Sequence, residues 1–146
     1  MDNPAPGGPM AQRITPQLMF EGDAEAAMRR YVSLFEDAEI THLERYGPGE
    51  PGAEGSVKQA EFTLGGRRYR CIDSPVSHAF TFTPSIALCI DCEDAAEFER
   101  LHAALAEGGE TLMPPDDYGF GARFAWLNDR FGVSWQLNLA HEEGTP

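Results

Sequence analysis

The last part of the chain alternates apolar and polar residues in a way that predicts a strand with two different faces. Residues 133–139 alternate in this way, following a run that contains Trp126 and a turn rich in Asn, Asp and Gly. Successive strand residues point to opposite faces, so the polar residues of this run share one face. These polar residues are Ser134, Gln136 and Asn138. Such a row of uncharged amides and hydroxyls suits either the wall of a ligand site or a solvated sheet face.

The first half of the chain has the pattern of a strand, a helix and three further strands. Apolar residues recur at helical spacing from Ala24 to Phe35, after a Gly22-Asp23 pair that favours a helix start. The pair Gly65-Gly66 between two alternating runs predicts a tight hairpin. The predicted strands are 14–20, 38–46, 56–64 and 67–72, and residues 47–55 are predicted to form a loop.

The second half repeats this order of elements. A helix is predicted at residues 95–106, between an acidic cap in the segment 91–94 and a stop at Gly108-Gly109. The loop 114–121 carries Tyr118 and Phe120, which would cover a ligand, anchor the loop to the core or form a dimer contact. The predicted strands are 80–91, 110–113 and the two strands of the closing hairpin, which lies between residues 124 and 139.

The repeated order predicts an α+β fold built from two β-α-β-β-β modules in one domain. A single helix covers only one face of a sheet, so each unit must find cover for the other face. We expect the modules, residues 13–74 and 79–140, to pair into a curved eight-stranded mixed sheet with the helices outside and a trough inside. Residues 1–12 are predicted to be a disordered leader and residues 141–146 a polar tail.

Composition narrows the possible partners and the compartment. The chain has 146 residues and a formal net charge of −13, which repels nucleic-acid phosphates and anionic lipid. We therefore expect no nucleic-acid partner and no membrane association, and no apolar run reaches the length of a membrane span. The 3 cysteines form no disulfide framework, which predicts the cytoplasm.

Several motifs carry a family resemblance that covers residues 13–140. They are Ile14-Thr15-Pro16, Arg45-Tyr46-Gly47, His78-Ala79-Phe80-Thr81-Phe82-Thr83-Pro84 and Phe131-Gly132-Val133-Ser134-Trp135-Gln136. With them the chain resembles the vicinal oxygen chelate (glyoxalase/bleomycin resistance/dioxygenase) superfamily. Within it the chain is similar to the PhnB-like branch, often labelled 3-demethylubiquinone-9 3-methyltransferase-like. The resemblance implies paired modules, a homodimer, and an active or binding site in the trough.

The resemblance also implies where a metal would bind. Catalytic members of the superfamily hold a divalent metal with His or Glu on the first strand of each module and Glu on the last strand. The corresponding places here look like Thr15 or Gln17, Ser85 and Gln136. Hydroxyls and neutral amides do not replace imidazole and carboxylate as ligands. We therefore expect neither a metal nor another cofactor, and the chain has no glycine-rich nucleotide-binding turn that would support methyl transfer.

The candidate site residues follow from strand parity and from loop position. His78 is a weak catalytic candidate, as a general base oriented by Asp73 or Asp91, or it is a structural histidine. The motif Cys89-Ile90-Asp91-Cys92 is a weak metal signal, and Cys92 has either a lowered pKa near a helix start or a packing role. Cys71 is expected to be buried. The ligand-binding candidates are Gln17, Met19, Ser85, Cys89, Tyr118, Phe120, Trp126, Ser134, Gln136 and Asn138.

Three functions are compatible with these patterns. The first is a metal-free protein that binds a small amphipathic molecule in the trough. The second is an enzyme acting on a small metabolite (a lyase, transferase or oxidoreductase) with an absent or non-standard metal site, such as His78 with Asp73. In the third, the trough is the surface on which a partner or a second copy binds.

Overall fold

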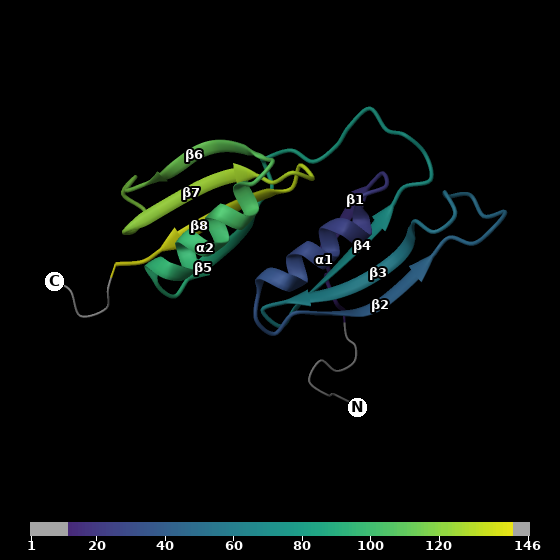
Figure 1. Ribbon diagram of the computed structural model, residues 1–146, viewed down its shortest axis with the longest axis horizontal. Helices are drawn as coiled ribbons and strands as arrows, with labels where there is room; N and C mark the ends of the chain where they lie inside the picture. The colour runs from purple at the N-terminus through teal and green to yellow at the C-terminus, as the bar shows by residue number, and fades with distance from the viewer. Residues whose placement is uncertain (1–11, 142–146) are drawn as a thin grey trace. The chain divides into compact units, whose positions relative to one another are not determined.

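The fold consists of two compact units, one ending at Ser77 and the other beginning at His78. A computed structural model describes residues 12–141, and each unit is a four-stranded sheet with one helix (Figure 1). Both units have the element order β-α-β-β-β, so the predicted α+β class and the two-module architecture are confirmed. The trough that the two sheets would share stays a prediction. The predicted leader and tail lie outside the described residues, except for Gln12 and His141.

The first module has the predicted elements within a few residues. Its strand order is β1-β4-β3-β2, with β1 parallel to β4 and the other pairs antiparallel. Gly65 and Gly66 join β3 to β4 with φ values of 58° and 79°, the left-handed angles that a two-residue hairpin turn requires. The elements are β1 (Gln17–Phe20), α1 (Ala24–Leu34), β2 (Glu39–Arg45), β3 (Val57–Leu64) and β4 (Arg67–Asp73).

Helix α1 covers one face of this sheet. Its buried residues include Met28 and Tyr31, and the Met28 Sδ atom lies 3.8 Å from the Cys71 Sγ atom of β4. Phe62 of β3 is also buried and belongs to the same face by strand alternation. The core of the module therefore lies between α1 and one sheet face, and the opposite face has no helix of this module on it.

The start of the first module differs from its prediction in two respects. Strand β1 begins at Gln17 and not at residue 14, because Pro16 has no N–H to donate; its carbonyl still accepts a hydrogen bond from the Arg70 amide at 2.9 Å. The side chain of Asp23 makes no capping hydrogen bond to α1. The carboxylate of Asp73 does so instead, since its Oδ1 atom accepts from the Gly22 amide at 2.8 Å and from the Ala24 amide at 3.0 Å.

The second module repeats this topology. Its strand order is β5-β8-β7-β6, with β5 parallel to β8. The Asp94 side chain caps α2 by accepting from the Glu97 amide at 2.8 Å, which confirms the predicted acidic cap. Among residues 12–141, no helix is long and apolar enough to cross a membrane. The elements are β5 (Leu88–Cys92), α2 (Ala95–Ala106), β6 (Glu110–Asp116), β7 (Arg123–Asn128) and β8 (Ser134–Leu139).

Two strands of the second module have bounds that the sequence pattern did not indicate. The predicted strand 80–91 is wrong over residues 80–87: its pairing with β8 begins only at Leu88, which lies opposite Trp135. Strand β6 continues to Asp116, through Pro114-Pro115, where a loop was predicted. It is an edge strand with an irregular register between Met113 and Asp116, and such positions tolerate proline.

The closing hairpin is held by a buried carboxylate. Residues 129–133 connect β7 to β8, and the Asp129 side chain is 6% exposed. Its Oδ1 atom accepts from the Phe131 and Val133 amides at 2.8 and 3.0 Å, and its Oδ2 atom accepts from the Trp135 indole at 2.8 Å. Asp129 thereby connects the turn to the face of the sheet that packs under α2, where Trp135 is buried.

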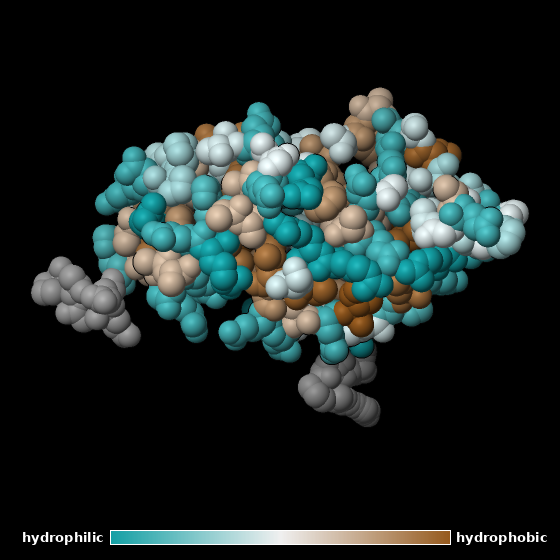
Figure 2. Space-filling model, in the orientation of Figure 1, coloured by the Kyte–Doolittle hydropathy of each residue, from teal (hydrophilic) through white to brown (hydrophobic). Residues whose placement is uncertain are grey.

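The segment between β4 and β5 carries apolar side chains that are exposed. Val76, Phe80 and Ile86 are 59%, 64% and 72% exposed. Figure 2 shows apolar surface among hydrophilic atoms along this segment, at the upper right. Residues 80–87 belong to the irregular connection that leads into β5.

Candidate functional site

The face of the second-module sheet that points away from α2 holds a row of paired side chains. Residues paired across a ladder project on the same face, so the register defines the row. Trp126 of β7 pairs with Met113 of β6 on one side and with Gln136 of β8 on the other, and Gln136 pairs with Cys89 of β5. We call this face the open face, and these four residues the central row. An indole, an amide, a thiol and a thioether thus lie side by side across all four strands.

A second row runs beside the central row on the same face. Phe124 of β7 pairs with Asp116 of β6 and with Asn138 of β8, and Asn138 pairs with Asp91 of β5. We call these four residues the acidic row, because exposed carboxylates stand at both of its ends. The open face therefore has an aromatic and amide centre with carboxylates at the edges of the sheet.

Hydrogen bonds hold the centre of the open face in place. The Trp126 indole donates to the Ser134 hydroxyl at 2.8 Å, and that hydroxyl lies 3.4 Å from the Leu127 carbonyl oxygen. Ser134 is only 2% exposed, so its hydroxyl is engaged with the indole beneath the surface of the open face. The Cys89 thiol is directed at the Gln136 Oε1 atom at 3.5 Å, a weak contact that leaves the amide able to bind other groups.

The loop between β6 and β7 forms an aromatic cluster next to the acidic row. The Phe120 and Phe124 rings meet edge-to-face at 4.9 Å, and Tyr118 meets Phe124 edge-to-face at 6.1 Å. The Tyr118 hydroxyl donates to the Pro114 carbonyl at 2.6 Å, which fixes the loop to β6. Phe120 stays 63% exposed. These contacts support the anchor interpretation for Tyr118, and they leave Phe120 free to contact a ligand.

Asn138 lies partly beneath this loop. Its Oδ1 atom is buried and has no hydrogen-bond partner among the described residues. A Cβ atom on Gly121 would lie 3.0 Å from that oxygen and 2.9 Å from the Leu139 carbonyl oxygen, so only glycine fits there comfortably. The Ala122 amide donates to the Leu139 carbonyl at 2.8 Å and holds the loop against the end of β8.

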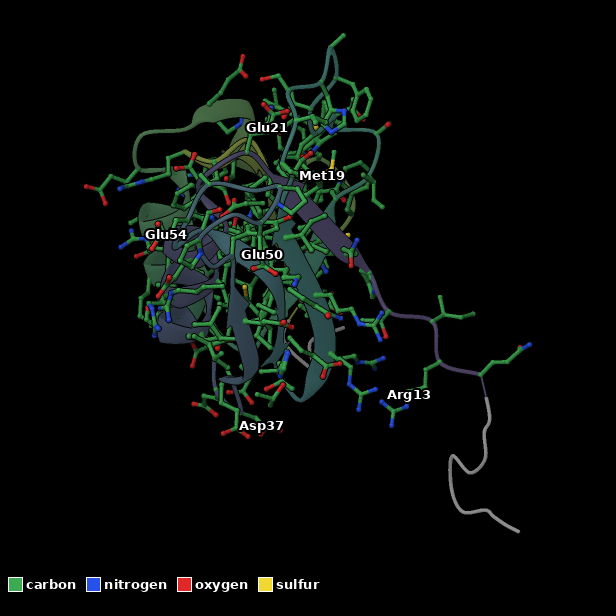
Figure 3. All side chains as sticks on the ribbon, turned by 90° about the vertical axis from the view of Figure 1, so that its right-hand side faces the viewer. Arg13, Met19, Glu21, Asp37, Glu50 and Glu54 are labelled. Carbon is green, nitrogen blue, oxygen red and sulfur yellow. The ribbon has the colours of Figure 1, made fainter. Side chains whose placement is uncertain are left out.

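Gln17 and Met19 belong to the corresponding face of the first module. Gln17 pairs with Arg70 and Met19 pairs with Ile72, on the face that α1 does not cover. Figure 3 shows Met19 on β1, which is an edge strand of its sheet. Strand parity therefore holds for these two candidates within their own module. Their predicted role in binding stays a prediction.

The prediction that Ser85 lies on a strand face is wrong. Ser85 is exposed in the irregular segment before β5, and its hydroxyl lies 2.7 Å from the Thr83 hydroxyl. Strand alternation therefore gives no direction for this side chain. Cys89, by contrast, lies in β5 and is exposed at the end of the central row.

Of the two weak catalytic candidates, His78 and Asp73, the Asp73 carboxylate has a structural role. Asp73 is 3% exposed, and besides the two amides at the start of α1 its Oδ2 atom accepts from the Val57 amide at 3.0 Å. Both carboxylate oxygens are thus engaged by backbone N–H groups. The His78 imidazole stacks on Phe80 with the ring centroids 4.8 Å apart.

The cysteines do not form a metal pair. Cys89 and Cys92 are three residues apart on one strand, so they project on opposite faces of the sheet. Burial raises the pKa of the Cys92 thiol to about 11, with a further contribution from the Glu97 carboxylate, so the predicted alternative of a lowered pKa is wrong and the packing role holds. Cys71 is buried as expected, and burial raises the pKa of its thiol to about 12.

The side chains present do not fit the divalent metal that the superfamily resemblance implies. Within residues 12–141, no group of three or more His, Cys, Asp or Glu side chains is arranged to hold a metal ion. Gln136, at the place of the expected Glu, presents a neutral amide oxygen beside a thiol and an indole. A neutral amide is a weak ligand for the first-row metals that such sites hold.

Comparison with known proteins decides the family. The family model described as 3-demethylubiquinone-9 3-methyltransferase matches residues 12–138. The chain belongs to this family. A putative 3-demethylubiquinone-9 3-methyltransferase (PhnB protein) from Bacillus cereus is 51% identical, covering 88% of this chain and 100% of that one, with a TM-score of 0.86. The PhnB-like resemblance drawn from the motifs is therefore confirmed.

Two further solved structures extend the comparison. A protein from Pseudomonas aeruginosa is 27% identical over 90% of this chain and 100% of that one, with a TM-score of 0.79. A glyoxylase/bleomycin resistance protein/dioxygenase domain from Frankia is 16% identical over 93% and 96% of the two chains, with a TM-score of 0.58, and shows the fold alone. No curated protein matches the chain.

Sequence reasoning missed four residues of the central and acidic rows. Phe124 could have been found, because it lies two residues before Trp126 on the same strand and so shares its face. Asp91 was considered as a partner of His78 and as a helix cap, although it lies two residues after Cys89 and so shares its strand face. Met113 and Asp116 were hidden by the irregular register of β6, which brings residues three apart onto one face.

Proposed function

We propose that this PhnB-like protein binds a small amphipathic molecule on the open face of the second-module sheet, without a metal ion. The observation that carries the proposal is the central row, in which the Trp126 indole and the Gln136 amide are neighbours on a face that α2 does not cover. Ligand sites characteristically combine aromatic surface with a few fixed polar groups. The hydrogen bond from Trp126 to Ser134 supports it further, because a pre-ordered ring binds at lower entropic cost.

A compound screen in the presence of a metal chelator tests the proposal. Protein purified without an affinity tag should contain no stoichiometric metal by elemental analysis. Small amphipathic compounds should raise its melting temperature, and the same compounds should fail to stabilise Gln136→Ala and Trp126→Leu. Glu99→Gln is the control, because Glu99 lies on α2 and pairs with Arg123 at 3.5 Å. Stoichiometric metal, or stabilisation that Gln136→Ala and Trp126→Leu retain, would contradict the proposal.

An enzyme remains the alternative, because the family description names a methyltransferase. The reaction would then use the same face, with Gln136 as a hydrogen-bonding group in place of a metal ligand. Calorimetric titration with S-adenosylmethionine separates the two functions: binding of this methyl donor would favour the enzyme, and its failure to bind would favour the binding protein.

We also propose that the protein works in the cytoplasm as a homodimer. The compartment is supported by Cys71, Cys89 and Cys92, which are all free thiols. The homodimer is supported by the family resemblance. Light scattering coupled to size-exclusion chromatography should give about twice the chain mass of 16.0 kDa, and a monomer mass would contradict this assignment.

A further inference from the structure

We propose that the ligand of the open face is a flat aromatic molecule that carries a positive charge. This inference rests on the proposed binding function and names the chemical class of the ligand. Two independent observations carry it: the arrangement of the aromatic rings at the face, and the sign of the charges around them.

Aromatic rings cluster at the start of β7, and Trp126 follows two residues further along the same strand face. Phe124 and Trp126 lie two residues apart on the open face, and the Phe120 ring meets Phe124 at 4.9 Å. The Tyr118 hydroxyl bond to Pro114 and the Trp126 indole bond to Ser134 hold two of the rings in place. Phe120 remains 63% exposed beside them. Exposed rings that are already ordered offer stacking and edge contacts to another flat ring at low entropic cost.

The charges at this face are all negative. Asp91 and Asp116 close the two ends of the acidic row, with Phe124 and Asn138 between them. Glu110 lies at the far end of β6, in register with Asn128. By register and strand alternation, no Lys, Arg or His projects from the described strands onto the open face. A cation is therefore attracted by the carboxylates and by the electron-rich faces of the rings, and an anion is repelled by both.

Two arginines of the second module are held elsewhere by other contacts, and the third, Arg100, lies on helix α2. Arg123 lies over the Phe98 ring of α2 at 5.3 Å and reaches Glu99, on the covered side of the sheet. Arg130 lies in the hairpin loop and pairs with Glu107 at 3.5 Å. Neither the Arg123 nor the Arg130 guanidinium pairs with the carboxylates of the acidic row in these contacts. Those carboxylates can therefore attract a cationic ligand.

The first module shows that this charge pattern is particular to the second. On the face that α1 leaves uncovered, Arg70 pairs in register with Gln17 and with Glu61. Arg68 lies on the same face and forms an ion pair with Glu61 at 3.0 Å. By register the carboxylates of Glu39, Glu44 and Glu61 share that face with the two guanidinium groups, so its charge is mixed. The charge of the open face of the second module is of one sign.

Three matched probes test the charge of the ligand by calorimetric titration: 2-naphthylmethylammonium, 2-naphthylmethanol and 2-naphthoate. They share one ring system and differ in charge, so differences in affinity report the electrostatic contribution. The expected result is binding of the cation about ten-fold tighter than the neutral alcohol, as two exposed carboxylates and a cation–π contact would give, with the anion weakest. Raising the ionic strength should shrink the difference.

Variants locate the effect. The double variant Asp91→Asn/Asp116→Asn should reduce the preference for the cation over the alcohol, because it removes the two charges and keeps the rings with their cation–π contact. Glu99→Gln should behave as the unmodified protein. Equal or tighter binding of the alcohol or the naphthoate by the unmodified protein would overturn the charge assignment and leave the binding function standing. Failure of all three probes, together with failure of every compound in the chelated screen, would overturn both.

Discussion

Replacing Asp73 by Asn should destabilise the first module through a single lost acceptor. The Asp73 carboxylate is 3% exposed and accepts hydrogen bonds from the Gly22, Ala24 and Val57 amides at 2.8 to 3.0 Å. Asn keeps one oxygen, which can still serve the two amides at the start of α1. Its NH₂ group would then face the Val57 amide, so two donors meet where a donor and an acceptor met before.

The magnitude follows from these contacts. Loss of one charge-assisted hydrogen bond, with a buried donor left unpaired, should lower the free energy of unfolding by roughly 1.5–3 kcal/mol. Asp73→Ala leaves all three amides without an acceptor. It should lower the free energy of unfolding by roughly 3–6 kcal/mol, a large share of an ordinary domain's stability. For the Asn variant the urea midpoint should fall by about 1 M, given a denaturant slope typical of small proteins.

Urea unfolding followed by far-ultraviolet circular dichroism measures the effect. Asp23→Asn is the matched control, since Asp23 precedes the same helix, is exposed and makes no side-chain cap. It should change stability by less than about 0.5 kcal/mol. Equal effects of Asp73→Asn and Asp23→Asn would refute the reasoning that the distant carboxylate, and not the adjacent one, organises the start of α1.

Three further predictions concern the second module and the thiols. Ellman's reagent at pH 8 should modify only Cys89 in the folded protein and all 3 cysteines in urea, because burial keeps Cys71 and Cys92 protonated; fast labelling of a second thiol would contradict this. The raised pKa values of the Cys71 and Cys92 thiols, about 12 and about 11, mean that the folded state holds their protons more tightly than the unfolded state. Stability should therefore fall as the pH rises from about 9 towards 11, and unfolding midpoints that stay constant over that range would contradict it. Ser134→Ala should lower the free energy of unfolding by about 1–2 kcal/mol, because the Trp126 indole loses its acceptor; an unchanged urea midpoint would count against the positioning role of Ser134.

Much of the fold could be predicted from the sequence because local signals agreed with one another. The apolar residues of the helix Ala24–Leu34 recur at helical spacing throughout. The glycines of Gly65-Gly66 readily adopt the positive φ angles that the turn between β3 and β4 requires. The ends of the strands were harder to predict from the sequence, because they depend on where a partner strand is available for pairing. Residues 80–87 alternate like a strand, yet β8 offers them no pairing.

The candidate site could be predicted from the sequence only in part, for a related reason. Parity along one strand correctly grouped Gln136 with Asn138 and placed Cys89 on an exposed face. The register between strands, which brings Met113 and Asp116 to the same face, depends on an irregularity in β6 that no local pattern reveals. Long-range hydrogen bonds, such as those that Asp73 makes to residues on β3 and before α1, are likewise properties of the assembled fold.

The indole resonances of the protein test the central claim most directly. The chain has 2 tryptophans: Trp126 on the open face, bonded to Ser134, and Trp135 on the covered face, bonded to Asp129. In a ¹H–¹⁵N spectrum recorded with chelator present, titration with 2-naphthylmethylammonium should shift the Trp126 indole signal saturably and leave that of Trp135 in place. A shift of Trp135 alone, no shift of Trp126 at saturating probe, or a shift that requires added metal would contradict metal-free binding on the open face.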